Sequence, residues 1–191
     1  MSPGSLLHRV VPQVLLILWM LATAYPVAAE FTVARVETRY EGNRLVLDLG
    51  IDYGFSQEAL EALDHGVPLT LEVHIRLRGV DDWVWDPSLI DQRLRYVIRY
   101  KPLSEHYLVF PLPGNDGVSY VTRDAAIAAL GEIHSLQLAS KKQLRAAGGP
   151  FALWIKAALD TDELPLPLRP IAYLFPAWKL SSGWTQWPLQ P

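Results

Sequence analysis

The chain has 191 residues, a formal net charge of −3 at pH 7 and no cysteine. This length suits one domain with a substantial hydrophobic core. The lack of cysteine excludes a disulfide scaffold, thiol catalysis and cysteine-ligated metal sites. The mildly acidic charge gives no overall case for nucleic-acid binding.

The first 29 residues have the composition of an export signal. A basic pair, His8-Arg9, precedes the apolar run Val14–Ala24, and small residues lead up to Ala29. This pattern predicts a cleaved signal peptide over residues 1–29 and therefore a periplasmic protein. The alternative is an uncleaved anchor in the inner membrane, because Val10–Ala29 is about long enough to span a bilayer.

The domain begins with a predicted hairpin and a short helix. Phe31–Tyr40 and Leu45–Tyr53 alternate between apolar and polar residues, and the turn residues Gly42-Asn43 stand between them. Ser56 is a typical helix N-cap, and Gly66 is typical of the residue that follows a helix.

The clearest strand of the chain follows that helix. Leu69–Arg78 places five aliphatic side chains on one face and polar or charged side chains on the other. Further strands are predicted over Arg93–Lys101, His106–Leu112 and Val118–Val121.

The second half of the chain predicts two more helices and a strand. One helix is capped by Thr122 and ends at Gly131, and the next begins at Ser140 and stops before Gly148. Phe151–Leu159 has strand length. The proline-rich segment that follows is predicted to be extended, with three leucines inserted into the core: Leu164, Leu166 and Leu168.

Short strands separated by turns, with no internal repeat and no linker, predict a mostly β protein. We expect a single antiparallel β-sandwich-like domain with three short helices over residues 30–191.

Basic residues gather on two of the predicted strands. Strand geometry puts each set on one face: His74, Arg76 and Arg78 in one strand, and Arg93, Arg95, Arg99 and Lys101 in the other. If the strands are neighbours, they form a positive plate for anionic lipid headgroups, an anionic glycan or an acidic partner. The alternative is that acids such as Glu72, Asp48 and Asp52 neutralise these arginines across strands.

A loop rich in acids and tryptophan is a second candidate binding surface, formed by Asp81, Asp82, Trp83, Trp85 and Asp86. Exposed aromatic residues often mark interaction sites, but a cysteine-free domain also needs their area in its core. The spacing of the acids does not match a calcium-binding EF-hand loop.

The sequence contains no HExxH zinc motif and no Gly-x-Ser-x-Gly nucleophile motif. We therefore assign no catalytic residue, no cofactor and no metal ligand.

Several short motifs together resemble a known family. They are Glu61-Ala62-Leu63, Gly66-Val67-Pro68-Leu69, Ala129-Leu130-Gly131, Leu164–Arg169 and a tail with Trp178, Trp184 and Trp187. Over nearly all of the chain after residue 29, the sequence is similar to domain of unknown function 4390, an uncharacterised family of exported Gram-negative proteins. The resemblance implies an exported single domain without catalytic residues to carry over. The family is often encoded beside a membrane sensor kinase of the nitrogen-regulation type, which implies a role in envelope signalling.

Two classes of function follow. The first is a non-catalytic binding or accessory protein of the periplasm or envelope, whose partner is an envelope protein, such as a membrane sensor kinase, or an anionic envelope ligand. Contact with the membrane surface is compatible with this hypothesis, and nucleic acid is not an expected partner. The alternative is an envelope glycan hydrolase that uses the loop carboxylates, or a structural subunit of an envelope assembly.

Overall fold

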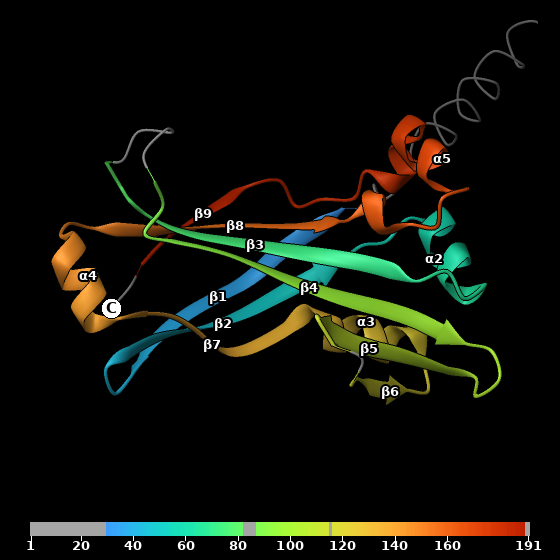
Figure 1. Ribbon diagram of the computed structural model, residues 1–191, viewed down its shortest axis with the longest axis horizontal. Coiled ribbons are helices and arrows are strands. Elements are labelled where there is room, and N and C mark those ends of the chain that lie inside the picture. The colour runs from blue at the N-terminus through green and yellow to red at the C-terminus, as the bar shows by residue number, and fades with distance from the viewer. Residues whose placement is uncertain (1–29, 82–86, 115, 190–191) are drawn as a thin grey trace, which may run out of the picture.

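The computed structural model describes residues 30–81, 87–114 and 116–189. These residues form two antiparallel β-sheets with helices at their ends, as Figure 1 shows. The prediction of a mostly β, sandwich-like domain is therefore confirmed.

The smaller sheet, sheet A, has the strand order β1-β2-β7. β1 (Phe31–Glu41) and β2 (Arg44–Tyr53) form the predicted hairpin, and Glu41 pairs with Arg44. Gly42 in the two-residue turn has a φ of +61°, a conformation that glycine adopts without steric cost. β7 (Glu132–Ser140) completes the sheet beside β2.

The larger sheet, sheet B, has the order β6-β5-β4-β3-β8-β9, and all of its pairs are antiparallel. Its strands are β3 (Leu69–Gly79), β4 (Ile90–Lys101), β5 (His106–Leu112), β6 (Val118–Tyr120), β8 (Phe151–Leu159) and β9 (Thr185–Pro188). β3 lies in the interior of the sheet between β4 and β8. The central strand is thus the one whose alternation is clearest in the sequence.

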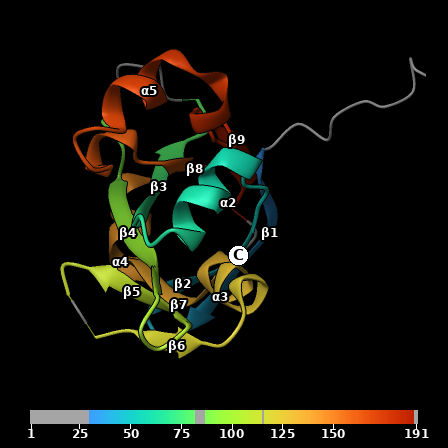
Figure 2. The ribbon, with the colours of Figure 1, turned by 90° about the vertical axis from the view of Figure 1, so that its right-hand side faces the viewer.

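The helices are α2 (Gln57–Asp64), α3 (Arg123–Gly131), α4 (Lys141–Ala147) and α5 (Arg169–Leu174), with 3₁₀ turns η1 (Thr161–Glu163) and η2 (Pro176–Trp178). The predicted caps are present. Ser56 Oγ accepts a hydrogen bond from the Ala59 amide, and Ser140 and Gln143 form a capping box. Figure 2 views the molecule from the end that carries α2, α3 and α5.

The core lies between the two sheets. The aliphatic face of β3 is wholly buried and packs with the apolar residues of β2 and β8 in one cluster. The residues of β3 that form this face are Leu69, Leu71, Val73, Ile75 and Leu77. Because side chains alternate along a strand, the polar residues of β3 lie on the opposite, outer face of sheet B.

Three parts of the fold differ from the sequence prediction. β7 and β9 were not predicted. In β7, the alternation is interrupted, because Ser135 has a φ of +52° and the pairing with β2 shifts register. The proline-rich segment is not extended throughout, since residues 166–168 form a turn and α5 begins at Arg169. Leu164 is buried as predicted, but Leu166 is 74% exposed.

Candidate functional site

The outer face of sheet B brings the two predicted basic stripes together. β3 pairs with β4 so that His74 lies opposite Arg93 and Arg76 lies opposite Asp91. β8 borders β3 on its other side and adds Lys156, which lies opposite His74. We call the resulting surface the basic face, formed by His74, Arg76, Arg78, Arg93, Arg95, Arg99, Lys101 and Lys156.

Carboxylates neutralise part of this basic face. Arg95 Nη2 lies 2.9 Å from Asp160 Oδ2 and 2.8 Å from Glu163 Oε1, and Arg93 lies 3.6 Å from Glu72. The hydrogen bond to Glu163 raises the pKa of Arg95, helped by the charge of Asp160 and opposed by burial.

The acids that neutralise the basic face are mostly not those that the sequence suggested. Glu72 does pair with an arginine of the basic face. Asp48 instead binds Arg39 within sheet A, and Asp52 is exposed on β2. Asp160 and Glu163 replace them because the turn after β8 brings η1 back towards β4.

His74 is the most buried member of the basic face, at 6% exposure. Its Nε2 lies 2.6 Å from Asp91 Oδ1, and Arg76 Nε donates to Asp91 Oδ2 over 3.1 Å. Burial raises the pKa of Asp91, but the hydrogen bond and charge of His74, together with Arg76, lower it below its usual range. Asp91 is therefore an ionised carboxylate that holds two basic side chains in place.

Trp184 from the C-terminal tail covers this cluster. Its ring centroid lies 4.9 Å from that of His74, and the Arg76 guanidinium lies 4.8 Å above the indole. A cation over an indole is attracted by the negative face of the ring. Trp184 stays 40% exposed, so it still presents indole surface to a ligand.

A groove of about 230 Å³ opens beside Trp184, and it is lined by Glu72, His74, Arg93, Lys156, Ala158 and Trp184. Within the described residues, Lys156, Arg99 and Lys101 form no ion pair, whereas Arg93 has only the long contact with Glu72. The groove thus combines an aromatic wall with cationic donors, a combination that suits an anionic group attached to a flat or apolar body.

Most of the predicted acidic and aromatic loop lies outside the described residues, namely Asp82, Trp83, Trp85 and Asp86. Asp81 is described and exposed just after β3. Among the described residues, no cluster of three or more His, Asp or Glu side chains is placed to hold a metal ion.

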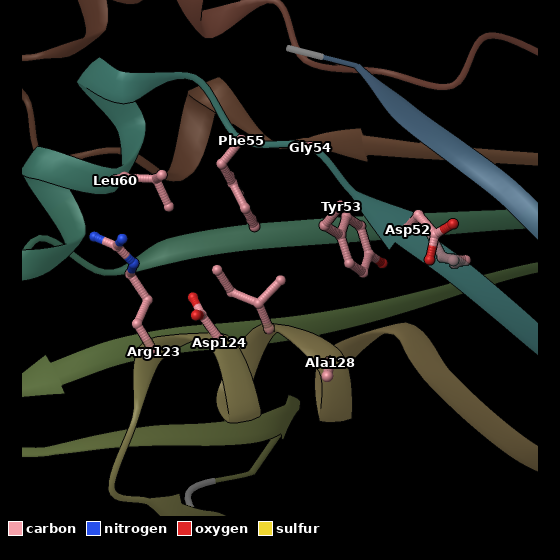
Figure 3. Close-up of a pocket in the computed structure, with 10 residues that line it drawn as sticks. Asp52, Tyr53, Gly54, Phe55, Leu60, Arg123, Asp124 and Ala128 are labelled. Atoms are coloured by element: carbon pink, nitrogen blue, oxygen red, sulfur yellow. The ribbon is translucent and has the colours of Figure 1, made fainter. Parts of the chain in front are cut away.

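A second cavity, of about 450 Å³, lies between the end of β2, α2 and α3. In Figure 3, Phe55 and Leu60 approach it from above, and Arg123 and Asp124 rise from α3 below. The Arg123 guanidinium is already paired with Asp64 at 2.6 Å. Most residues that line this cavity are apolar. The charged residues in its lining are Asp52, Asp124 and Arg123, and Arg123 is already paired.

Some features of these sites have only weak sequence signals. Lys156 lies within a strand that is otherwise apolar, so only the pairing of β8 with β3 assigns it to the basic face. Trp184 lies 110 residues from His74 in the chain, and the sequence offers no reason to place the two rings together. The second cavity depends on how α2 and α3 pack.

Comparisons with known proteins match the chain to a family model. A family model described as Domain of unknown function (DUF4390) matches residues 28–188. No curated protein and no solved structure matches the chain. In the part of the chain that the structure describes, no helix has the length and hydrophobicity needed to cross a membrane.

Proposed function

We propose, for a chain that belongs to the family Domain of unknown function (DUF4390), a non-catalytic binding role in the cell envelope. In this proposal the protein is exported by its N-terminal signal peptide to the periplasm. There the basic face and its groove bind an anionic partner, and the partner class we favour is the acidic surface of an envelope protein. The exported part of a membrane sensor kinase is the candidate suggested by the family resemblance.

The groove beside Trp184 is the observation that carries the proposal. The whole chain has a net charge of −3, yet the basic face carries eight basic side chains. Four of them, His74, Arg76, Arg93 and Lys156, contact the exposed indole of Trp184 or line the groove beside it. Basic side chains that exceed the carboxylates on the same surface steer an oppositely charged partner and select against others.

Arg99, Lys101 and Lys156 are the members of the basic face that we expect to contact the partner. Arg99 and Lys101 are exposed on β4, and Lys156 borders the groove. Arg95 lies on the same face of β4, but two carboxylates hold it. Reversing the charge of Arg95 would therefore disturb the fold as well as binding, and it is a poor test of binding.

The hydrolase alternative gains no support from the two described acids nearest the loop, Asp81 before it and Asp91 in β4 after it. Asp91 is engaged by His74 and Arg76, and its lowered pKa is the opposite of what a general acid needs at neutral pH. Asp81 lies exposed just after β3.

The test is crosslinking in intact cells, followed by purification of a C-terminally tagged full-length chain and mass spectrometry. We compare the unaltered protein with the double variant Arg99→Glu/Lys156→Glu. The matched control is Lys142→Glu/Arg145→Glu, which makes the same charge change on α4 at the other end of the molecule.

The proposal expects an envelope protein that is recovered with the unaltered chain and the α4 control but lost with the basic-face variant. The association of this envelope protein with the purified chain should also weaken as the salt concentration rises from about 0.05 to 0.5 M, because exposed charges are screened. Equal recovery with both variants, or recovery of the protein alone, would overturn the proposal. Thermal unfolding of each variant is measured as a control for an intact fold.

A further inference from the structure

Apolar side chains are exposed in one short segment at the α5 end of the molecule. Ten large apolar side chains are exposed in the described residues, and five of them lie between residues 166 and 175. We call these five the apolar cap: Leu166, Ile171, Tyr173, Leu174 and Phe175. Leu166 and Leu174 are each about three-quarters exposed, at 74% and 76%. An apolar patch that monomeric proteins normally avoid marks a contact surface.

The segment is fixed to the domain by its other side. Leu164 and Ala172 are almost completely buried, and Trp178 is 5% exposed. Arg169 Nε donates a hydrogen bond to the Leu164 carbonyl over 2.7 Å. Because these contacts use the inward side of the segment, the apolar cap cannot turn into the core without breaking them.

The apolar cap differs chemically from the basic face. Residues 164–178 contain one charged residue, Arg169. Tyr173 keeps its ring exposed while its hydroxyl donates to Asp162. Exposed aliphatic side chains next to aromatic rings form the kind of apolar surface that enters the interface of a lipid bilayer.

The chain enters the domain at this same end. Glu30 accepts a hydrogen bond from the Gly54 amide, and the rings of Phe31 and Phe55 are 5.2 Å apart. Phe55 leads into α2, which packs against η2, the turn that follows α5. Figures 1 and 2 show the start of β1 on the side of the molecule that carries α2 and α5.

The residues before this entry point are suited to a membrane. Residues 10–29 contain no charged side chain, and 20 residues are about the length that spans the hydrocarbon core as a helix. The inference rests on the uncleaved form of this segment, the second of the two alternatives for the N-terminus. A retained anchor holds the end of the domain to which it is joined close to the bilayer surface. The apolar cap lies at that end.

We propose that the apolar cap docks on the lipid bilayer, with Leu166, Tyr173, Leu174 and Phe175 inserted at the level of the headgroups. This contact fixes the orientation of the domain, with the α5 end towards the membrane. α4, at the opposite end of the sheets, points away from it (Figure 1). The proposal does not depend on the partner of the basic face.

Because the chain has no cysteine, a single fluorescent label can test this orientation. Leu174→Cys carries an environment-sensitive fluorophore in the full-length chain, reconstituted with vesicles of phosphatidylethanolamine and phosphatidylglycerol that contain spin-labelled lipids. The control label is at Ala146→Cys, exposed on α4. We expect blue-shifted emission and quenching by shallow spin labels at position 174, both persisting in 1 M salt, and neither at position 146.

A second pair of variants tests whether an exposed leucine is responsible for the lipid quenching, and neither substitution touches the core. With the label at Leu166→Cys, adding Leu174→Glu should weaken the quenching about tenfold, since an inserted leucine would be replaced by a charge. Adding Lys142→Glu on α4 should leave it unchanged.

Three results would overturn the proposal. One is equal quenching at positions 174 and 146. Another is a blue shift at position 174 without quenching by lipid, which would assign the apolar cap to a protein partner. The third is efficient crosslinking of two copies of the Leu174→Cys variant through the introduced thiol, which would assign the apolar cap to a second copy of this chain.

Discussion

Arg95 and Arg99 lie on the same face of β4, but the structure assigns them different roles, and a matched pair of substitutions tests this. We predict that Arg95→Met lowers the free energy of unfolding, whereas Arg99→Met hardly changes it. Arg95 bridges Asp160 and Glu163 at 2.9 and 2.8 Å, and so ties β4 to the turn that follows β8. Arg99 is exposed and forms no ion pair within the described residues.

The magnitude follows from geometry and exposure. A hydrogen bond to a charged group contributes about 1.5–3 kcal/mol when well shielded, but exposed ion pairs contribute about 0–1 kcal/mol. The side chains of Arg95 and Asp160 are 32% and 20% exposed, and that of Glu163 is 49% exposed. We therefore expect a loss of about 1–2 kcal/mol for Arg95→Met and less than about 0.5 kcal/mol for Arg99→Met.

The assay is urea unfolding of both variants at low and high salt, with a double-mutant cycle that adds Asp160→Asn. The cycle separates the pair interaction from other effects of each substitution. The cost of Arg95→Met should shrink in 1 M salt, because screening weakens partly exposed pairs. Equal costs for the two arginine variants, or no coupling with Asp160, would refute the reasoning.

Three further predictions concern pH and packing. Burial raises the pKa of Asp91, but the hydrogen bonds and charges of His74 and Arg76 together lower it below its ordinary value. The stability that it contributes is thus present above pH of about 4 and is lost as pH falls further, so Asp91→Asn should flatten the acid limb of stability against pH, measured by urea unfolding. Burial, followed by a hydrogen bond to the carboxylate at the end of α2, raises the pKa of Tyr107 to about 12. The associated stability is present below the ordinary tyrosine pKa of about 10 and is lost as pH rises towards 12, so Tyr107→Phe should reduce the alkaline loss, and absorbance at 295 nm should show one fewer late-titrating tyrosine. Finally, a Cβ at Gly131 would lie 2.2 Å from the Ile51 carbonyl oxygen, so Gly131→Ala should cost about 1–3 kcal/mol in the same unfolding assay; an unchanged midpoint would contradict the close packing of α3 on β2.

The sequence predicts local structure well where the alternation is regular. Leu69–Arg78 has strict period-two patterning, and β3 has the predicted faces. Ser56 and Thr122 predict helix starts because their side-chain oxygens can satisfy free amide groups at the first turn, and both do so. β7 was missed because a bulge changes its period in the middle of the strand.

The candidate site was predictable only in part. The basic side of each strand follows from alternation, but the acids that neutralise it come from distant parts of the chain. Asp160 is 65 residues from Arg95, so no local pattern indicates their contact. The exposure of Leu166 was also not predictable, because proline-rich segments bury some leucines and display others according to how the segment turns.

The order of strands along the chain also sets the order in which the native protein can form. β3 ends at Gly79, but its partner β8 begins only at Phe151. In the same way, β2 pairs with β7, which begins at Glu132. Neither sheet can pair all of its strands until most of the chain has left the ribosome, and pairing over such sequence distances is slow. During synthesis the apolar faces of β2 and β3 are therefore open to chaperones. A nascent chain in this state is still unfolded, as the export that we propose requires of a chain that passes through a translocation channel.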